Sequence, residues 1–117
     1  LSPNLATYGL TKNSIPYLTK TLGKEMKDSK IGFHTLSPGM VLTDLIIPHV
    51  NSENAKVFNI LCETPETVAK YLVPRIRATT GSGKSIRFLT KKKTIWRFLT
   101  SRKRKDRFFD IKGKLLH

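Results

Sequence analysis

The chain has 117 residues, 38% of them apolar, and a formal net charge of +14. This length is enough for one small domain with a modest core. Its single cysteine, Cys62, excludes an internal disulfide, suits a reducing compartment and is expected to be a small buried side chain. No apolar run approaches the roughly 18 residues that a membrane-spanning helix needs. The charge predicts affinity for an anionic surface or partner without determining the fold.

A helix is predicted over residues 6–27, where large apolar side chains recur at steps of three and four. Pro16 inside it should remove one backbone hydrogen bond. Tyr8 and Lys12 then lie one turn apart on the same face. An ammonium at that distance favours the phenolate and lowers the tyrosine pKa from about 10, which suits a general acid that protonates a carbonyl oxygen. A Tyr-x3-Lys pair is common, and for the bare motif a solvated helix face is the simpler interpretation.

The segment after this helix favours the catalytic interpretation of the Tyr8–Lys12 pair over a solvated helix face. A polar turn over residues 28–30 leads into a mostly apolar run over 31–36, which predicts a buried parallel strand and ends in Ser-Pro-Gly with a threonine a few residues on. The Tyr-x3-Lys helix, this strand and Pro-Gly-x-x-x-Thr, in this order, resemble the short-chain dehydrogenase/reductase family. The resemblance implies an α/β fold, in which the chain is the carboxyl-terminal part of a Rossmann-type doubly wound parallel sheet with a basic helical tail.

The same resemblance implies roles for six residues. Tyr8 would be the catalytic acid, and Lys12 would bind the nicotinamide ribose while tuning Tyr8, so that both also contact the cofactor. The nicotinamide and pyrophosphate end of the cofactor would be lined by Pro38, Gly39, Val41 and Thr43. These four residues follow a strand, and ligands of open parallel sheets bind beyond the carboxyl ends of the strands.

The family's Gly-rich nucleotide-binding half and its serine would lie upstream of Leu1. We therefore expect this chain alone to be inactive. The upstream half also carries the residue that distinguishes NADP from NAD, so this chain leaves that choice open.

Further elements follow the predicted strand. A helix is expected over residues 53–62, and another should begin with Thr64 as N-cap and Pro65 at its first position and end near residue 77. Gly81-Ser82-Gly83 departs from a phosphate-binding loop and fits a tight turn into a last strand over 86–89. The helix that begins at Pro65 should turn Val68, Leu72 and Ile76 toward the core.

Two features between these elements have less specific interpretations. Residues 45–50 are apolar and interrupted by a proline, which suits either a loop packed on the sheet or a lid over substrate. His34 stands alone, without a second histidine or cysteine at metal spacing, so we expect a packed core residue and no metal site.

The composition changes at residue 91. Residues 91–117 hold 11 of the 22 Lys and Arg residues, so we divide the chain into residues 1–90, the carboxyl-terminal half of a reductase domain, and 91–117, a basic amphipathic tail. Large apolar side chains stand between the cationic runs of this tail, at Ile95, Trp96, Phe98 and Leu99. Such a helix suits an anionic membrane surface or an apolar contact with a partner subunit or the core. Nucleic-acid binding lacks an accompanying motif, and we do not expect it.

The segments after Met40 are more specific. They include Phe58-Asn59-Ile60 with Cys62, Leu72-Val73-Pro74-Arg75, and Arg107-Phe108-Phe109-Asp110 with Gly113, and they resemble chlorophyll b reductases of the non-yellow-colouring type through nearly the whole chain. This resemblance implies NADPH-dependent reduction of the 7-formyl group of chlorophyll b to hydroxymethyl, a step of chlorophyll breakdown, at the thylakoid membrane of the chloroplast. It leaves homo- or hetero-oligomers open. The alternatives are a different short-chain carbonyl reductase or a non-catalytic basic module that binds membranes.

Overall fold

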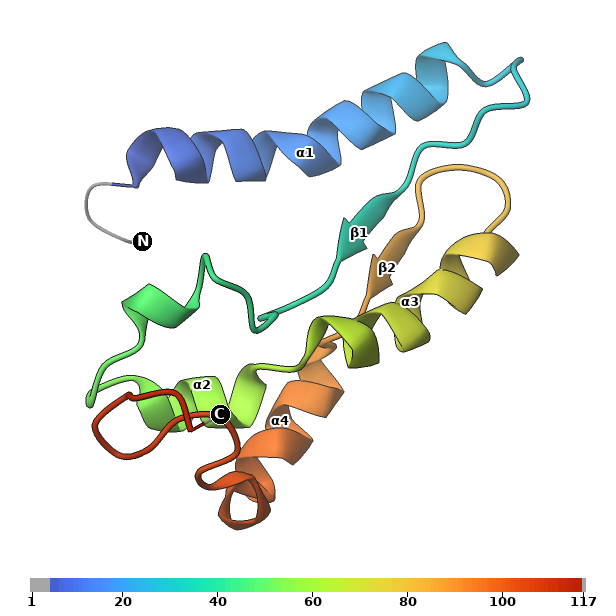
Figure 1. The fold of residues 1–117 in the computed structure, drawn as a ribbon. Helices are drawn as coiled ribbons and strands as arrows, with labels where there is room; N and C mark the ends of the chain where they lie inside the picture. The colour runs from blue at the N-terminus through green and yellow to red at the C-terminus, as the bar shows by residue number, and fades with distance from the viewer. Residues whose placement is uncertain (1–4, 117) are drawn as a thin grey trace. The chain divides into compact units, whose positions relative to one another are not determined.

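The computed structural model of the protein describes residues 5–116 (Figure 1). Its helices are α1 (Ala6–Glu25), α2 (Ala55–Leu61), α3 (Pro65–Ala78) and α4 (Lys91–Leu99), with the 3-10 helices η1 (Ile47–His49) and η2 (Ser101–Arg104). Its strands are β1 (Thr35–Ser37) and β2 (Ser85–Arg87), which pair in parallel as a two-stranded sheet. The α/β composition is confirmed, whereas the larger doubly wound sheet stays a prediction.

The chain divides into two compact units. The first comprises Leu1–Leu36 with Arg75–Ile86, and the second comprises Ser37–Pro74 with Arg87–His117. Residues 91–116 belong to the same unit as residues 37–74. The division of the chain into a reductase part and a tail after residue 90 stays a prediction. The two units are described separately below.

Helix α1 of the first unit follows the predicted periodicity and ends at Glu25, two residues before the expected end. It continues through Pro16, and none of its side chains is buried. The backbone N–H of Met26, the C-cap residue, donates to the carbonyl of Leu22 (2.9 Å), and the N–H of Lys27 donates to the carbonyl of Lys24 (3.4 Å), which closes the last turn. Pro16 therefore does not divide α1 into two helices.

The expected strand over residues 31–36 is shorter than predicted and begins only at Thr35. Phe33 bonds to the glycine turn instead of a strand, since its N–H donates to Ser82 Oγ (3.0 Å) and its carbonyl accepts from the N–H of Gly83 (2.7 Å). His34 is half-buried, and its Nδ1 accepts from the N–H of Lys84 at 3.2 Å. The turn interpretation of the glycines is confirmed, because Gly81 and Gly83 have φ of 76° and 79° and β2 follows directly.

The second unit holds the larger part of the buried core. Helix α2 packs against α4 and η2 (Figure 1). Helix α3 begins as predicted, with Thr64 Oγ1 accepting from the N–H of Thr67 at 3.3 Å and Pro65 at the first helical position. Its inward positions are partly confirmed, because Val68 and Leu72 are buried whereas Ile76 is exposed. Buried apolar side chains of the unit are Ala55, Ile60, Cys62, Val68, Leu72, Phe88 and Phe109.

The expected core position of Cys62 is confirmed, since its side chain has no exposed surface. Residues 45–50 contain η1 rather than a plain loop. Their interpretation as a packed loop or a lid remains open.

Phe109, near the carboxyl end of the chain, is a main contributor to this core. Its ring is fully buried and meets Phe58 edge to face, with the centroids 6.3 Å apart. We expect Phe109→Ala to lower the free energy of unfolding by about 3–5 kcal/mol, because it removes a buried aromatic and leaves a cavity. Ile111→Ala is the matched control, since Ile111 is 72% exposed two residues away. Urea unfolding followed by circular dichroism measures both, and equal losses would contradict the assignment of Phe109 to the core.

Candidate functional site

Tyr8 and Lys12 lie together on helix α1, as their spacing predicts. Lys12 Nζ is 5.5 Å from the centroid of the Tyr8 ring, and Tyr8 is 60% exposed, so its phenol is open to a ligand. Pro16 has no N–H to donate to the carbonyl of Lys12, one helical turn before it, yet the helix keeps both side chains on one face. Helix α1 therefore places the ammonium of Lys12 beside the Tyr8 ring in the first unit. Their catalytic roles stay predictions.

The remaining four predicted residues lie in the second unit, in residues 38–43, which we call the cofactor loop after the role predicted for them. Gly39 has a φ of 76°, and a Cβ at this position would lie 3.0 Å from the Cβ of Leu89. The positive φ therefore favours glycine there, and a larger residue would also be in tight contact with Leu89. Pro38, Gly39 and Thr43 are exposed, and Val41 is half-buried. The structure describes this loop and the Tyr8–Lys12 pair within separate units, so their joining into one site stays a prediction.

The cofactor loop is held by main-chain hydrogen bonds to Glu63. The N–H of Glu63 donates to the carbonyl of Met40 (3.0 Å), and the N–H of Leu42 donates to the carbonyl of Glu63 (2.9 Å). Val41 between them forms a parallel bridge with Glu63. The path of the loop therefore depends on the position of Glu63.

The side chain of Glu63 is buried and shared by two arginines of the tail. Its Oε2 accepts from Arg97 Nη2 at 2.9 Å, and its Oε1 accepts from Arg107 Nη2 at 2.7 Å. The same guanidinium groups donate to carbonyls next to Glu63, Arg97 Nη1 to Leu61 (2.9 Å) and Arg107 Nη1 to Cys62 (3.3 Å). We call Glu63, Arg97 and Arg107 the Glu63 cluster.

The sequence pattern did not predict this cluster, because Arg97 and Arg107 stand in a strongly basic tail and Glu63 belongs to no motif. One signal was available. Glu63 is an acid directly after an apolar helical stretch, and Arg97 stands among four large apolar residues. A lone charge in apolar surroundings is usually paired when it is buried.

Burial and neighbouring charges shift the pKa values of two arginines in and beside the cluster. Desolvation lowers the pKa of Arg97, and the charge of Glu63 opposes this shift. Desolvation also lowers the pKa of Arg104, and the positive charges of Arg97 and Arg107 add to the effect. Arg97 Nε and Arg104 Nη1 are buried without a hydrogen-bond partner among residues 5–116. The cluster thus sits in a strongly cationic part of the unit.

Asn59 fixes the end of the tail beside the cluster. Its amide nitrogen donates to the carbonyl of Phe109 (2.8 Å), and its Oδ1 accepts from the N–H groups of Phe108 (2.9 Å) and Phe109 (3.0 Å). A buried side-chain amide that is paired in this way fixes one path for the chain. The segment 107–109 is therefore bound to α2 through both Asn59 and Arg107.

Helix α4 shows an orientation that the apolar pattern does not predict. Its buried side chain is Arg97, whereas Trp96 and Leu99 are 65% and 75% exposed, and Ile95 and Phe98 are exposed as well. One of the alternatives left open, packing of these apolar residues against the core, is wrong for this unit, because Arg97 occupies the inward position to reach Glu63. The contacts with a membrane or a partner subunit stay predictions.

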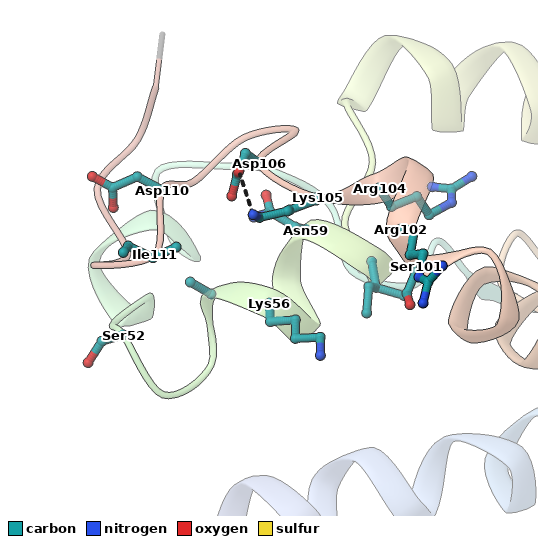
Figure 2. Close-up of a pocket in the computed structure, with 12 residues that line it drawn as sticks. Ser52, Lys56, Asn59, Ser101, Arg102, Arg104, Lys105, Asp106, Asp110 and Ile111 are labelled. Carbon is teal, nitrogen blue, oxygen red and sulfur yellow. Dashed lines mark ion pairs between the residues drawn. The ribbon is translucent and has the colours of Figure 1, made fainter.

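A cavity of about 360 Å³ lies between α2, η2 and residues 106–111 (Figure 2). Its apolar wall is formed by Ala55, Ile60 and Ile111, and its rim by the charged residues Lys56, Arg102, Arg104, Lys105, Asp106 and Asp110. Lys105 and Asp106 pair across 4.0 Å, as the dashed line in Figure 2 marks. The six predicted site residues do not line this cavity.

Within residues 5–116, no three His, Cys, Asp or Glu side chains gather where they could hold a metal ion. In the same part of the chain, no helix has the length and apolar character needed to cross a membrane.

Comparison with curated proteins finds similar chains among chlorophyll(ide) b reductases. The probable chloroplastic chlorophyll(ide) b reductase NYC1 of Oryza sativa subsp. japonica is 44% identical over 99% of this chain, and NYC1 of Arabidopsis thaliana is 42% identical over the same share. The chloroplastic chlorophyll(ide) b reductase NOL of Arabidopsis thaliana is 50% identical over 76% of this chain. The matched region covers 23% of each NYC1 protein and 28% of NOL, so the chain spans about a quarter of their length. No protein-family model matches the chain, and no solved structure matches it.

The thiol of Cys62 gives a pH test of the packing around the Glu63 cluster. Burial raises its pKa from 9.0 to about 11, although the charge of Arg107 opposes the shift. Between these two values the folded chain keeps a thiol proton that the unfolded chain has lost. The contribution of Cys62 to stability is therefore complete below pH 9.0 and declines as the pH rises to about 11.

We expect the free energy of unfolding to fall more steeply with pH in this window for the wild type than for Cys62→Ala, which shares every other titrating group. Urea unfolding at a series of pH values measures both slopes. Equal slopes would contradict a buried thiol.

Proposed function

We propose that this chain, a homologue of the carboxyl-terminal part of chlorophyll(ide) b reductases, supplies the proton donor and the cofactor loop of such a reductase in the chloroplast. The substrate would be chlorophyll b or a related pigment, whose 7-formyl group is reduced to hydroxymethyl. The cofactor would be a nicotinamide dinucleotide, NADPH by the resemblance. Similarity over almost the whole chain supports the family, and the Tyr8–Lys12 pair on α1 supports the chemistry.

The residues present fit a nicotinamide cofactor and a carbonyl substrate. When bound, the cofactor would supply a hydride to the formyl carbon. Tyr8 would hand its phenolic proton to the formyl oxygen, which completes the alcohol, and the ammonium of Lys12 would stabilise the phenolate that this transfer leaves. Pro38, Gly39 and Thr43 are exposed, and their main-chain carbonyls and the hydroxyl of Thr43 would provide polar contacts along the cofactor loop.

The observation that carries the proposal is the exposed Tyr8 phenol with Lys12 Nζ 5.5 Å from its ring. A different short-chain carbonyl reductase would use the same pair. The two candidates differ in substrate, and the similarity to four chlorophyll(ide) b reductases favours the pigment.

Tyr8→Phe tests the proton donor in the complete reductase. The substitution removes the phenolic proton and keeps the ring, so turnover should fall by about 10²–10⁴-fold, the usual contribution of a general acid, with folding unchanged. Tyr17→Phe is the matched control, because Tyr17 lies on the same helix and is also exposed. Reduction of the 7-formyl group is followed by pigment absorbance. Wild-type turnover in Tyr8→Phe would refute the assignment of Tyr8.

A second candidate function is attachment to an anionic membrane surface through α4. The exposed Trp96 and Leu99 favour it, together with cations on both sides at 91–93 and 102–105. Attraction to an anionic leaflet is worth about 1 kcal/mol per nearby cation, so several cations would contribute more than one inserted aromatic ring. Binding should therefore weaken steeply with salt.

Trp96 is the single tryptophan of the chain, and its fluorescence reports this contact directly. We expect a blue shift on adding vesicles that contain anionic lipid, loss of the shift at high salt, and little shift with neutral vesicles. Trp96 emission that is unchanged by anionic vesicles would exclude this surface as the membrane contact.

A further inference from the structure

Glu63 is bonded on two sides to parts of the chain that are far apart in sequence. Its main chain pairs with Met40 and Leu42 of the cofactor loop. Its carboxylate is held by Arg97 and Arg107 of the tail, which are 34 and 44 residues further along the chain. All of these contacts lie within the second unit. One residue thus connects the tail to the cofactor loop.

The geometry of these contacts restricts how Glu63 can move. The two arginines approach different oxygens of the carboxylate, and each also donates to a main-chain carbonyl of residues 61–62. Charge-assisted hydrogen bonds of this length are strong and directional. A displacement of either arginine would therefore move the main chain of residues 61–63. Glu63, which forms the parallel bridge with Val41, would move with it.

We propose that Glu63, Arg97 and Arg107 are positioning residues for cofactor binding, so that the tail sets the affinity of the enzyme for its nicotinamide cofactor. This inference rests on the proposed function, because it takes the loop 38–43 as part of the cofactor site. None of the three residues contacts the cofactor in this scheme. They act through the main chain of Glu63, which holds residues 40–42 in place.

The physical reason is that a binding loop gains affinity when its bound conformation exists beforehand. Weakening the Glu63 cluster would let the loop populate other conformations, and the cofactor would then have to order it. Loss of this order should weaken cofactor binding more than the chemical step, since the step is carried out on cofactor that is already bound.

The test uses the complete reductase and compares Glu63→Gln with Glu53→Gln. Glutamine keeps the size and an acceptor at position 63 but removes the charge that both arginines bind. Glu53 is an exposed acid of the same unit and serves as the matched control. We expect the Kd for NADPH, from fluorescence titration, to rise about tenfold in Glu63→Gln, a coupling of the usual size between connected sites. The kcat at saturating NADPH should stay within about twofold, and Glu53→Gln should match the wild type in both.

Arg107→Lys provides a second variant that is easier to fold, because Arg107 is the less buried of the two arginines. Lysine keeps the charge but loses the forked geometry that reaches both Glu63 and the carbonyl of Cys62. It should show the same pattern with a smaller rise in Kd. Circular dichroism at the assay temperature confirms that each variant is folded.

The outcomes separate the inference from the function on which it rests. A folded wild-type enzyme that binds neither NADPH nor NADH would refute the proposed function. If the wild type binds NADPH while folded Glu63→Gln and Arg107→Lys bind it equally well, the positioning role is wrong and the proposed function stands. A fall in kcat at unchanged Kd would also overturn the positioning role.

Discussion

The second unit depends on one buried carboxylate shared by two guanidinium groups. Removing one partner of such a buried pair typically costs about 3–5 kcal/mol, because the remaining charge is left uncompensated in the interior. Glu63 has an opposite partner on each oxygen, and the carbonyls of residues 59–62 take up further donors of Arg97 and Arg107. This arrangement explains why residues 87–116 form one compact unit with residues 37–74.

The pairing of Arg97 with Glu63 also determines which side of α4 faces inward. A nine-residue helix with four large apolar side chains would ordinarily bury them, but here the buried position belongs to Arg97. The apolar residues are exposed as a consequence, at Ile95, Trp96, Phe98 and Leu99. The cationic side chains of the second unit therefore fall into two groups. Arg97 and Arg107 are bound to Glu63, whereas other cations flank the exposed apolar residues of α4. The cations and apolar residues exposed on α4 are the reason to test a surface contact of this helix.

The two parts of the predicted site depend on different kinds of contact. The Tyr8–Lys12 pair needs only a helix, because side chains four residues apart share a face. The cofactor loop needs more. Gly39 lies close to Leu89, which stands just before the tail. Residues 40–42 are hydrogen-bonded to Glu63, whose carboxylate is held by two arginines of the tail. The similarity to chlorophyll(ide) b reductases extends over that tail as well as over the loop.

The sequence by itself determined the features that follow local rules. The periodicity of α1, the Thr64–Pro65 start of α3, the glycine turn at 81–83 and the spacing of Tyr8 and Lys12 all depend on residues within a few positions of one another. Tertiary structure decided what depends on distant partners. Phe33 bonds to Ser82 and shortens the predicted strand, and Glu63 meets two arginines across 34 and 44 residues. No periodicity or local motif encodes these contacts, because the cost of removing the charges from water is offset only when the folded chain brings the distant partners together.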